Sequence, residues 1–194
     1  MLLVGTRGFV GFVIDGIEKI TYNHFDSYPN GLGKDVLDWI RDVYLGEVHD
    51  EVVQRVRDLR VVSEGSEPTD EDIERLSIYL NTGVGEHRER PNWYQLLRET
   101  QGDLAAILNA GVMLDSSDFP LDSLFAEWGY LVDFDNSTFE VYEGFQRDQH
   151  HHGRFAHRQA KRTEYYPCAL FTSWPFSALP SDDEFEKTFG GDEE

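Results

Sequence analysis

Two short runs of strand-forming residues meet at Asp15 and Gly16, and this junction constrains the fold more than any other local feature. Residues 9–14 form an apolar run rich in Phe and Val, and residues 17–22 alternate between apolar and polar side chains. An Asp-Gly pair between two such runs is typical of the tight turn of a β-hairpin. The sequence therefore predicts an antiparallel hairpin over residues 9–22.

A second hairpin is predicted toward the other end of the chain. Residues 129–134 and 138–142 are rich in aromatic and β-branched side chains, and the polar residues 135–137 separate them. Residues 168–172 form a further apolar strand candidate. We expect the hairpins at 9–22 and 130–142 to lie in one antiparallel sheet, whose side chains include Phe9, Phe12, Ile14, Ile20, Tyr22, Leu131 and Phe139.

The middle of the chain carries apolar residues at helical spacing. This periodicity predicts helices within residues 34–61 and 92–110, which we expect to cover an apolar face of the sheet. Strands at both ends with helices between them indicate a single α+β domain over residues 1–180. From residue 181 onward the chain holds seven acids and one lysine, so residues 181–194 are predicted to form a mobile acidic tail.

Acidic residues outnumber Lys and Arg by 37 to 17, which gives a formal net charge of −20. Proteins that coat a nucleic-acid duplex neutralise its phosphates with Lys and Arg, and anionic membranes also attract basic segments. We therefore expect neither direct nucleic-acid binding nor membrane binding. Cys168 is the single cysteine, and no apolar run approaches the ~20 residues of a spanning helix. Residues 1–4 are too short for a signal-peptide core, so a cytoplasmic location is expected.

The charges are distributed unevenly along the chain. Residues 99–143 contain ten acids and no Lys or Arg, whereas residues 147–162 contain five bases, one acid and four histidines. One interpretation is a solvated acidic face beside a basic loop that pairs with it. The other is a pair of opposed binding surfaces, of which the acidic one captures a basic protein partner. Asp115 and Asp118, which precede Pro120 in a polar stretch, are the acids we expect to contact such a partner.

The segment that follows the first hairpin, residues 23–33, is the best candidate for a site. It brings a histidine, a carboxylate, hydroxyls and amides into one turn, and its glycines allow a ligand to approach the backbone. The alternative is that these polar side chains hydrogen-bond to their own loop. The candidate catalytic residues here are His24 and Asp26, and the candidate ligand-binding residues are Asn23, Ser27, Tyr28, Asn30, Gly31 and Gly33.

No metal or cofactor is predicted. The run His150 to His152 resembles no zinc motif, because three adjacent histidines cannot all face one ion and neighbouring basic residues repel a cation. The sequence contains neither a phosphate-binding Gly-x-x-x-x-Gly-Lys loop nor a Gly-x-Ser-x-Gly elbow. Cys168 lies in an apolar run, so we interpret it as a buried core residue.

Several segments resemble an uncharacterised family that occurs in actinobacteria, their phages, fungi and large viruses. The resemblance is carried by Gly-Thr-Arg-Gly at residues 5–8, by the loop through residues 21–33 and by segments at 101–104, 115–119 and 127–134. It covers roughly residues 5–145 and implies that the chain has relatives encoded by phages. It implies no activity.

A weaker resemblance links the N-terminus to N-terminal nucleophile hydrolases. In those enzymes a Gly-Thr pair precedes an apolar strand, a turn and a second strand, and cleavage before the Thr frees an amine that serves as its base. The resemblance implies a related fold and makes Thr6 the nucleophile. The present sequence lacks the Lys expected after the second strand, unless Lys34 takes that role. In addition, a GTG start codon at Val4 would leave Thr6 as the third residue of the chain.

Two functions are therefore expected from the sequence. The first is that of a small acidic, cytoplasmic and phage-related binding protein that acts through an acidic surface and the loop at 23–33. The alternative is an amide hydrolase with Thr6 as its nucleophile. The oligomeric state stays open.

Overall fold

The predicted N-terminal hairpin is confirmed. In the computed structural model, which describes residues 5–46, 48–85 and 87–190, strand β1 (Gly8–Ile14) pairs antiparallel with β2 (Ile17–Asn23), and Ile14 faces Ile17. Asp15 and Gly16 both adopt positive φ angles, 52° and 73°. Turns of this kind match the twist of the strands that they connect.

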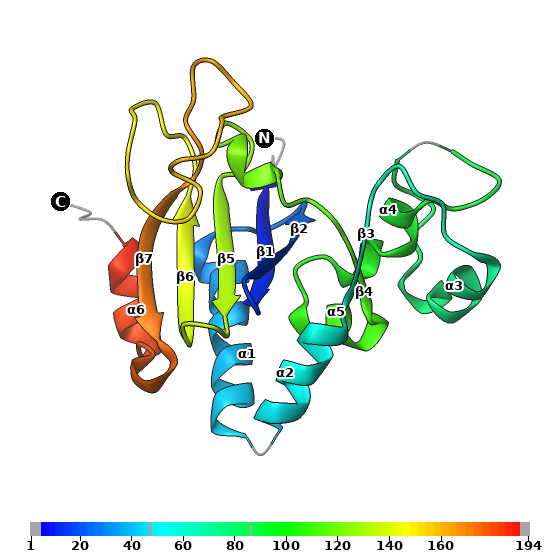
Figure 1. The fold of residues 1–194 in the computed structure, drawn as a ribbon, viewed down its shortest axis with the longest axis horizontal. Helices are drawn as coiled ribbons and strands as arrows, with labels where there is room; N and C mark the ends of the chain where they lie inside the picture. Colours follow the sequence, from blue (N-terminus) through cyan, green and yellow to red (C-terminus); the bar gives the residue numbers. More distant parts are fainter. Residues whose placement is uncertain (1–4, 47, 86, 191–194) are drawn as a thin grey trace.

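One mixed sheet contains both predicted hairpins (Figure 1). Its strand order is β2-β1-β5-β6-β7, where β5 is Trp128–Asp133, β6 is Thr138–Glu143 and β7 is Ala169–Pro175. The expectation of a wholly antiparallel sheet is wrong at one pairing, because β1 and β5 run parallel. The reason is that β2 ends beside the start of β1, and the chain enters β5 from that same end, with Trp128 opposite Gly8.

Helices cover one face of the sheet, as the periodicity predicts. Alternate residues of β1, β5 and β6 pack against α1 (Lys34–Leu45), α2 (His49–Asp58) and α5 (Leu104–Ala110) in one large apolar core. The predicted helical region 34–61 contains two helices, of which α1 ends at Leu45 and α2 ends at Asp58, short of residue 61. Residues 60–62 instead form β3 (Arg60–Val62), which pairs in parallel with β4 (Val112–Leu114).

The predicted helix over 92–110 is also broken into pieces. It consists of α4 (Trp93–Leu96), a 3-10 turn (Arg98–Thr100) and α5. Gly102 adopts a φ of +79° between the last two, and Asp103 then caps the N-terminus of α5. Together with α3 (Asp70–Arg75) and the β3–β4 pair, α4 builds a small lobe with its own core, at the right of Figure 1.

The opposite face of the sheet is covered by residues 144–168, the loops at the top of Figure 1. Phe155 from this segment packs on Phe9 and Tyr142, and Cys168 is fully buried in the same core. The interpretation of Cys168 as a core residue is confirmed. No helix among the described residues is long and apolar enough to cross a membrane.

The expectation of a mobile tail from residue 181 is wrong for residues 182–189. These residues form α6 (Asp182–Phe189), which Ser181 and Glu184 begin with a reciprocal capping box. Phe185 is only 1% exposed and packs against Phe139 and Trp174 of the sheet. Acids on the exposed side of an amphipathic helix do not prevent it from docking. Residues 191–194 lie outside the described part of the chain.

Candidate functional site

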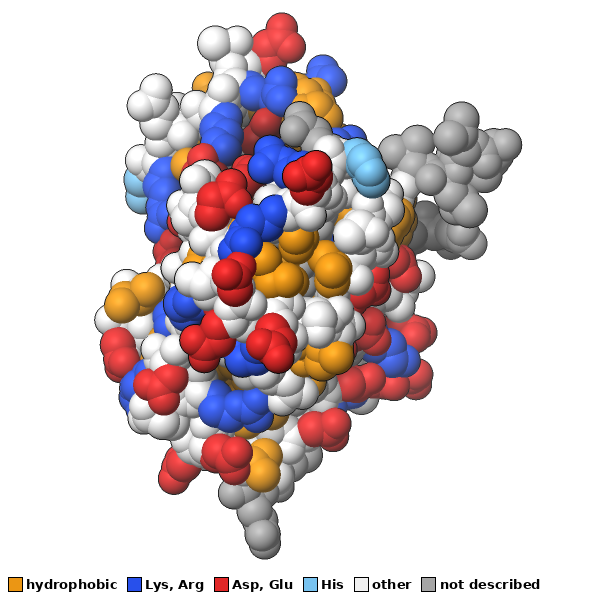
Figure 2. All heavy atoms as spheres, turned by 90° about the vertical axis from the view of Figure 1, so that its right-hand side faces the viewer, with side chains coloured by type: hydrophobic (Ala, Val, Ile, Leu, Met, Phe, Trp, Pro, Cys, Tyr) orange, Lys and Arg blue, Asp and Glu red, His pale blue; other side chains and the backbone are white. Residues whose placement is uncertain are grey.

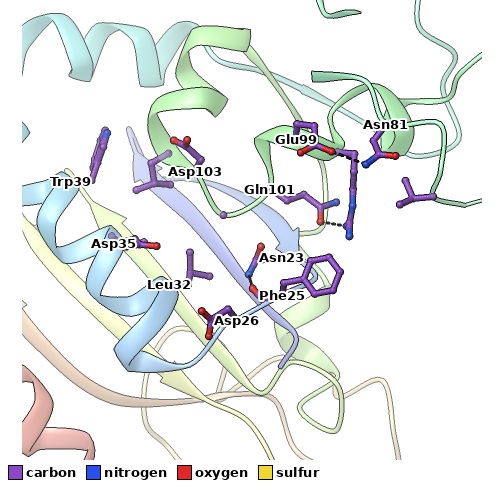
Figure 3. A pocket seen from close by; sticks show the side chains of 15 residues that line it. Asn23, Phe25, Asp26, Leu32, Asp35, Trp39, Asn81, Glu99, Gln101 and Asp103 are labelled. Carbon is purple, nitrogen blue, oxygen red and sulfur yellow. Dashed lines mark hydrogen bonds between the residues drawn. The ribbon is translucent and has the colours of Figure 1, made fainter. Parts of the chain in front are cut away.

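A cavity of about 660 Å³ opens beside the predicted loop (Figure 3). Its walls come from three stretches that are distant in sequence: residues 23–39, which run from the end of β2 through the loop into α1, residues 81–84, and residues 98–104 before α5. Leu32, Val36, Trp39 and Leu104 supply apolar surface, and Phe25 stands at the rim with 61% of its side chain exposed. Polar side chains of both amide and carboxylate type converge on the same space.

The backbone of the loop places Asp26 in this cavity. Asp26 has a φ of 47°, a left-handed conformation that is uncommon for residues other than glycine. Its carbonyl oxygen accepts the amide N–H of Leu32 at 3.1 Å, which closes the loop onto the turn Pro29–Gly33 that leads into α1. The absent side chain of Gly31 makes room for the Asp26 carboxylate, because a Cβ there would lie 2.7 Å from it.

Asn23 forms the floor between the loop and residues 98–104. Its side chain is only 5% exposed, and its Nδ2 donates to the Phe25 carbonyl and, at 2.9 Å, to Ser27 Oγ. Because the Phe25 carbonyl can only accept, the amide must be oriented with Oδ1 on the other side. That oxygen faces Gly102, where a Cβ would lie 2.9 Å away, and it has no hydrogen-bond partner among the described residues.

Four carboxylates line the cavity: Asp26, Asp35, Glu99 and Asp103. Glu99 accepts a hydrogen bond from Asn81 at 2.7 Å, and Asp103 Oδ1 accepts the Ala106 amide. Asp26 and Asp35 make no side-chain hydrogen bond with the described residues. Burial and the repulsion of Asp38, Asp26 and Asp103 together raise the pKa of Asp35. The site therefore carries a negative charge that the protein itself does not fully balance.

Arg98 is the cation among the described lining residues, and its guanidinium is already engaged. Nη1 contacts the Tyr94 hydroxyl at 3.2 Å and Gln101 Oε1 at 2.5 Å, and the group lies 5.1 Å from the centre of the Phe25 ring. Arg98 itself is buried. It therefore fixes the rim of the cavity and holds Gln101 in place.

The three predicted catalytic residues have different surroundings. His24 lies outside the cavity lining, where Nδ1 meets the Tyr22 hydroxyl at 2.7 Å; burial and then Arg98 and Arg7 lower the pKa of His24. Thr6 is 2% exposed, and its hydroxyl has no hydrogen-bond partner among the described residues. Of the three, only Asp26 faces the cavity.

The remaining loop residues divide into structural and exposed ones. Ser27 is fully buried, accepts from Asn23 and uses its carbonyl to accept the Tyr130 hydroxyl, so this part of the loop bonds to its own surroundings as the alternative interpretation supposes. Gly33 lies against the Tyr130 ring. Tyr28 and Asn30 are exposed and lie outside the cavity lining.

The acidic and basic stretches pair with each other, as the first interpretation of the charge pattern proposes. Three residues of the basic segment form ion pairs with the acidic stretch. Arg154 pairs with Asp133 and Glu140, Lys161 pairs with Asp118, and Arg162 pairs with Asp122. Figure 2 shows the same mixture on the side of the molecule that carries the small lobe, where acidic and basic side chains are interspersed. Asp118 is thus paired with Lys161 at 2.6 Å, and Asp115 accepts the Ser117 amide.

Within the described part of the chain, no three His, Cys, Asp or Glu side chains are grouped closely enough to hold a metal ion. The rings of His150 and His152 are stacked 6.2 Å apart, and His150 bonds to the Pro167 carbonyl.

Most of the cavity wall was missed by reasoning from the sequence. Asp35, Trp39 and residues 98–104 belong to segments interpreted as helices, whose polar residues gave no sign of facing the loop. The signal that was present is the Gly at 102, flanked by Gln101 and Asp103, which interrupts an apolar helical pattern.

Comparison of the chain with models of protein families, with curated proteins and with solved structures finds no match in any of the three.

Proposed function

We propose that the protein binds a small molecule in the cavity beside the loop at 23–33. The observation that carries this proposal is a cavity of about 660 Å³ in which an apolar wall meets converging polar groups from three segments. Pockets that hold small ligands typically measure roughly 300–1,000 Å³ and combine these two features.

The backbone of Asp26 supports the same conclusion. A left-handed conformation at a residue other than glycine costs of order 1–3 kcal/mol, and such strain concentrates at ligand sites. This backbone conformation places the Asp26 carboxylate in the cavity, and that carboxylate makes no hydrogen bond with the described residues of the protein.

Two other functions have less support. Capture of a basic partner through Asp115, Asp118 and the surrounding acids is opposed by the ion pairs that Asp118, Asp122 and Asp133 make with the basic segment. Hydrolysis by Thr6 needs a free amine and an accessible hydroxyl, and the Thr6 side chain is buried. That alternative stays a prediction, which loss of residues 1–5 from the intact mass would support and retention of Gly5 would end.

A thermal-shift screen with a cavity-blocking variant tests the proposal. The panel contains organic cations, organic anions and neutral sugars and alcohols. Val84→Trp places a large side chain at the cavity wall, and Val61→Trp makes the same change on exposed strand β3, away from the cavity. We expect at least one class to raise the Tm of the wild type and of Val61→Trp but not of Val84→Trp. Stabilisation by no compound, or stabilisation that persists in Val84→Trp, would overturn the proposal.

A further inference from the structure

We propose that the ligand of this cavity is an organic cation, which presents a protonated amine or guanidinium to Asn23, Asp26 and Asp35. This inference rests on the proposed function and adds the chemical class of the ligand. It follows from which hydrogen-bonding groups of the cavity are already used within the protein and which are not.

The unused groups of the cavity are mainly acceptors. Four acceptor groups have no partner among the described residues: Asn23 Oδ1, the carboxylate of Asp26, the carboxylate of Asp35 and the second oxygen of Asp103. The Asn23 oxygen is open to the cavity, since Thr6 Oγ1 is the buried side-chain polar atom without a partner among the described residues, so this oxygen can accept a donor from a ligand.

The cavity has one cationic side chain among its described lining residues, and it is partly engaged. Arg98 uses Nη1 for Tyr94 and Gln101 and lies over the Phe25 ring, and the Asn81 amide donates to Glu99. The indole of Trp39 and the amide of Gln101 are neutral donors. An anion would therefore meet four carboxylates against a single guanidinium, and a neutral polyol would leave the excess negative charge unbalanced.

A cation relieves the repulsion that the cavity contains. Asp35 stands close enough to Asp26 and Asp103 for each of them to raise its pKa, and a positive charge between these groups would be attracted to all three. The carboxylates surround an apolar wall of Leu32, Val36 and Trp39, which suits the hydrocarbon part of an aliphatic amine. Figure 3 shows Asn23 centrally placed, with Leu32 between it and the side chains of Asp26 and Asp35.

Isothermal titration calorimetry with matched probes tests this assignment. Cadaverine, pentanediol and glutarate share one carbon chain and differ in charge, and agmatine adds a guanidinium. We expect cadaverine or agmatine to bind the wild type, with an affinity that falls as salt rises because exposed charges are screened. Asp26→Asn and Asp35→Asn should each weaken binding about ten-fold. Asn tolerates the left-handed backbone of Asp26, so the first variant should keep its fold.

Asp148→Asn is the control, because it removes one exposed carboxylate from the segment that covers the opposite face of the sheet. Binding should be unchanged in it. If pentanediol or glutarate binds in a manner that Val84→Trp blocks, the proposed function stands and the assignment of a cation fails. The assignment also fails if magnesium or calcium binds and the amines do not. Absence of any ligand, here and in the wider panel, would end both proposals.

Discussion

Arg154 is expected to hold the loop over residues 144–168 to the sheet, and its loss should be among the more damaging single changes in the protein. Nη2 donates to Asp133 at 2.7 Å and to Glu140 at 2.8 Å, and Nε donates to Glu140 at 3.0 Å. Asp133 is 0% exposed, so Arg154→Met leaves a buried carboxylate without its cation. Breaking a buried pair in this way costs about 3–5 kcal/mol.

We expect the lower end of that range, because Asn136 keeps two hydrogen bonds of 2.9 Å to Asp133. A loss of about 3 kcal/mol should lower the Tm by roughly 6–12 °C in a chain of this size. Urea denaturation and calorimetry measure the change. The matched control is Arg158→Met, since Arg158 pairs with Glu18 and is 38% exposed in its side chain. It should cost under about 1 kcal/mol.

The pH dependence of the unfolding free energy distinguishes the Arg154–Asp133 ion pair from simple packing of the Arg154 side chain. Burial alone would raise the pKa of Asp133, but hydrogen bonds from Asn136 and Arg154 outweigh it and hold the pKa below its ordinary range. The wild type therefore loses this stabilisation as pH falls below about 4, whereas in Arg154→Met burial dominates and protonation of Asp133 becomes favourable. The difference in stability between the two should shrink from pH 7 toward pH 4. Equal losses in Arg154→Met and Arg158→Met at every pH would refute the reasoning.

Three further changes test other parts of the fold. Phe185→Ala should cost about 3–5 kcal/mol in denaturant unfolding, because α6 docks through this side chain, and an unchanged midpoint would mean that α6 is not part of the core. Lys19→Met should cost about 2 kcal/mol, since the Lys19 amine donates to three carbonyls at the end of α2; a cost as small as that of an exposed substitution would contradict this role. Because the pKa of His24 is lowered, stability should fall as pH drops below about 6.5, and His24→Gln should flatten that slope in thermal melts.

Local signals in the sequence were sufficient for the hairpins and insufficient for their arrangement. The Asp15-Gly16 turn is determined by neighbouring residues, so it could be predicted with its register. The parallel pairing of β1 with β5 joins residues about 120 positions apart and depends on where the intervening helices return the chain. No pattern within either strand contains that information.

Residues 181–194 were predicted to be mobile because their net negative charge was given more importance than the spacing of their apolar residues. Ser181 and Glu184 form a capping box, and Phe185 and Phe189 lie one helical turn apart among the acids. Both features are readable in the sequence and indicate an amphipathic helix. Net charge describes the solvent-facing side of such a helix and says little about the side that packs.

Only the smaller part of the candidate site was predicted from the sequence. Glycines and polar residues mark the loop in the sequence, and the structure places Asp26 in the cavity lining with Gly31 beside its carboxylate. Its other wall comes from residues 98–104, which tertiary packing alone brings to the loop. The role of Asn23 in the site depends on that contact, because Gly102 faces Asn23 Oδ1, which has no partner among the described residues.

The central claim is that this cavity receives a ligand, and nuclear magnetic resonance tests it most directly. In ¹H–¹⁵N spectra recorded during titration with cadaverine, the side-chain amide of Asn23 and the backbone amides of Gly31 and Gly102 should show the largest, saturable shifts. These groups surround the free acceptors of the cavity. Shifts confined to residues 144–168, or no saturable shift at Asn23 with any probe of the panel, would contradict the account.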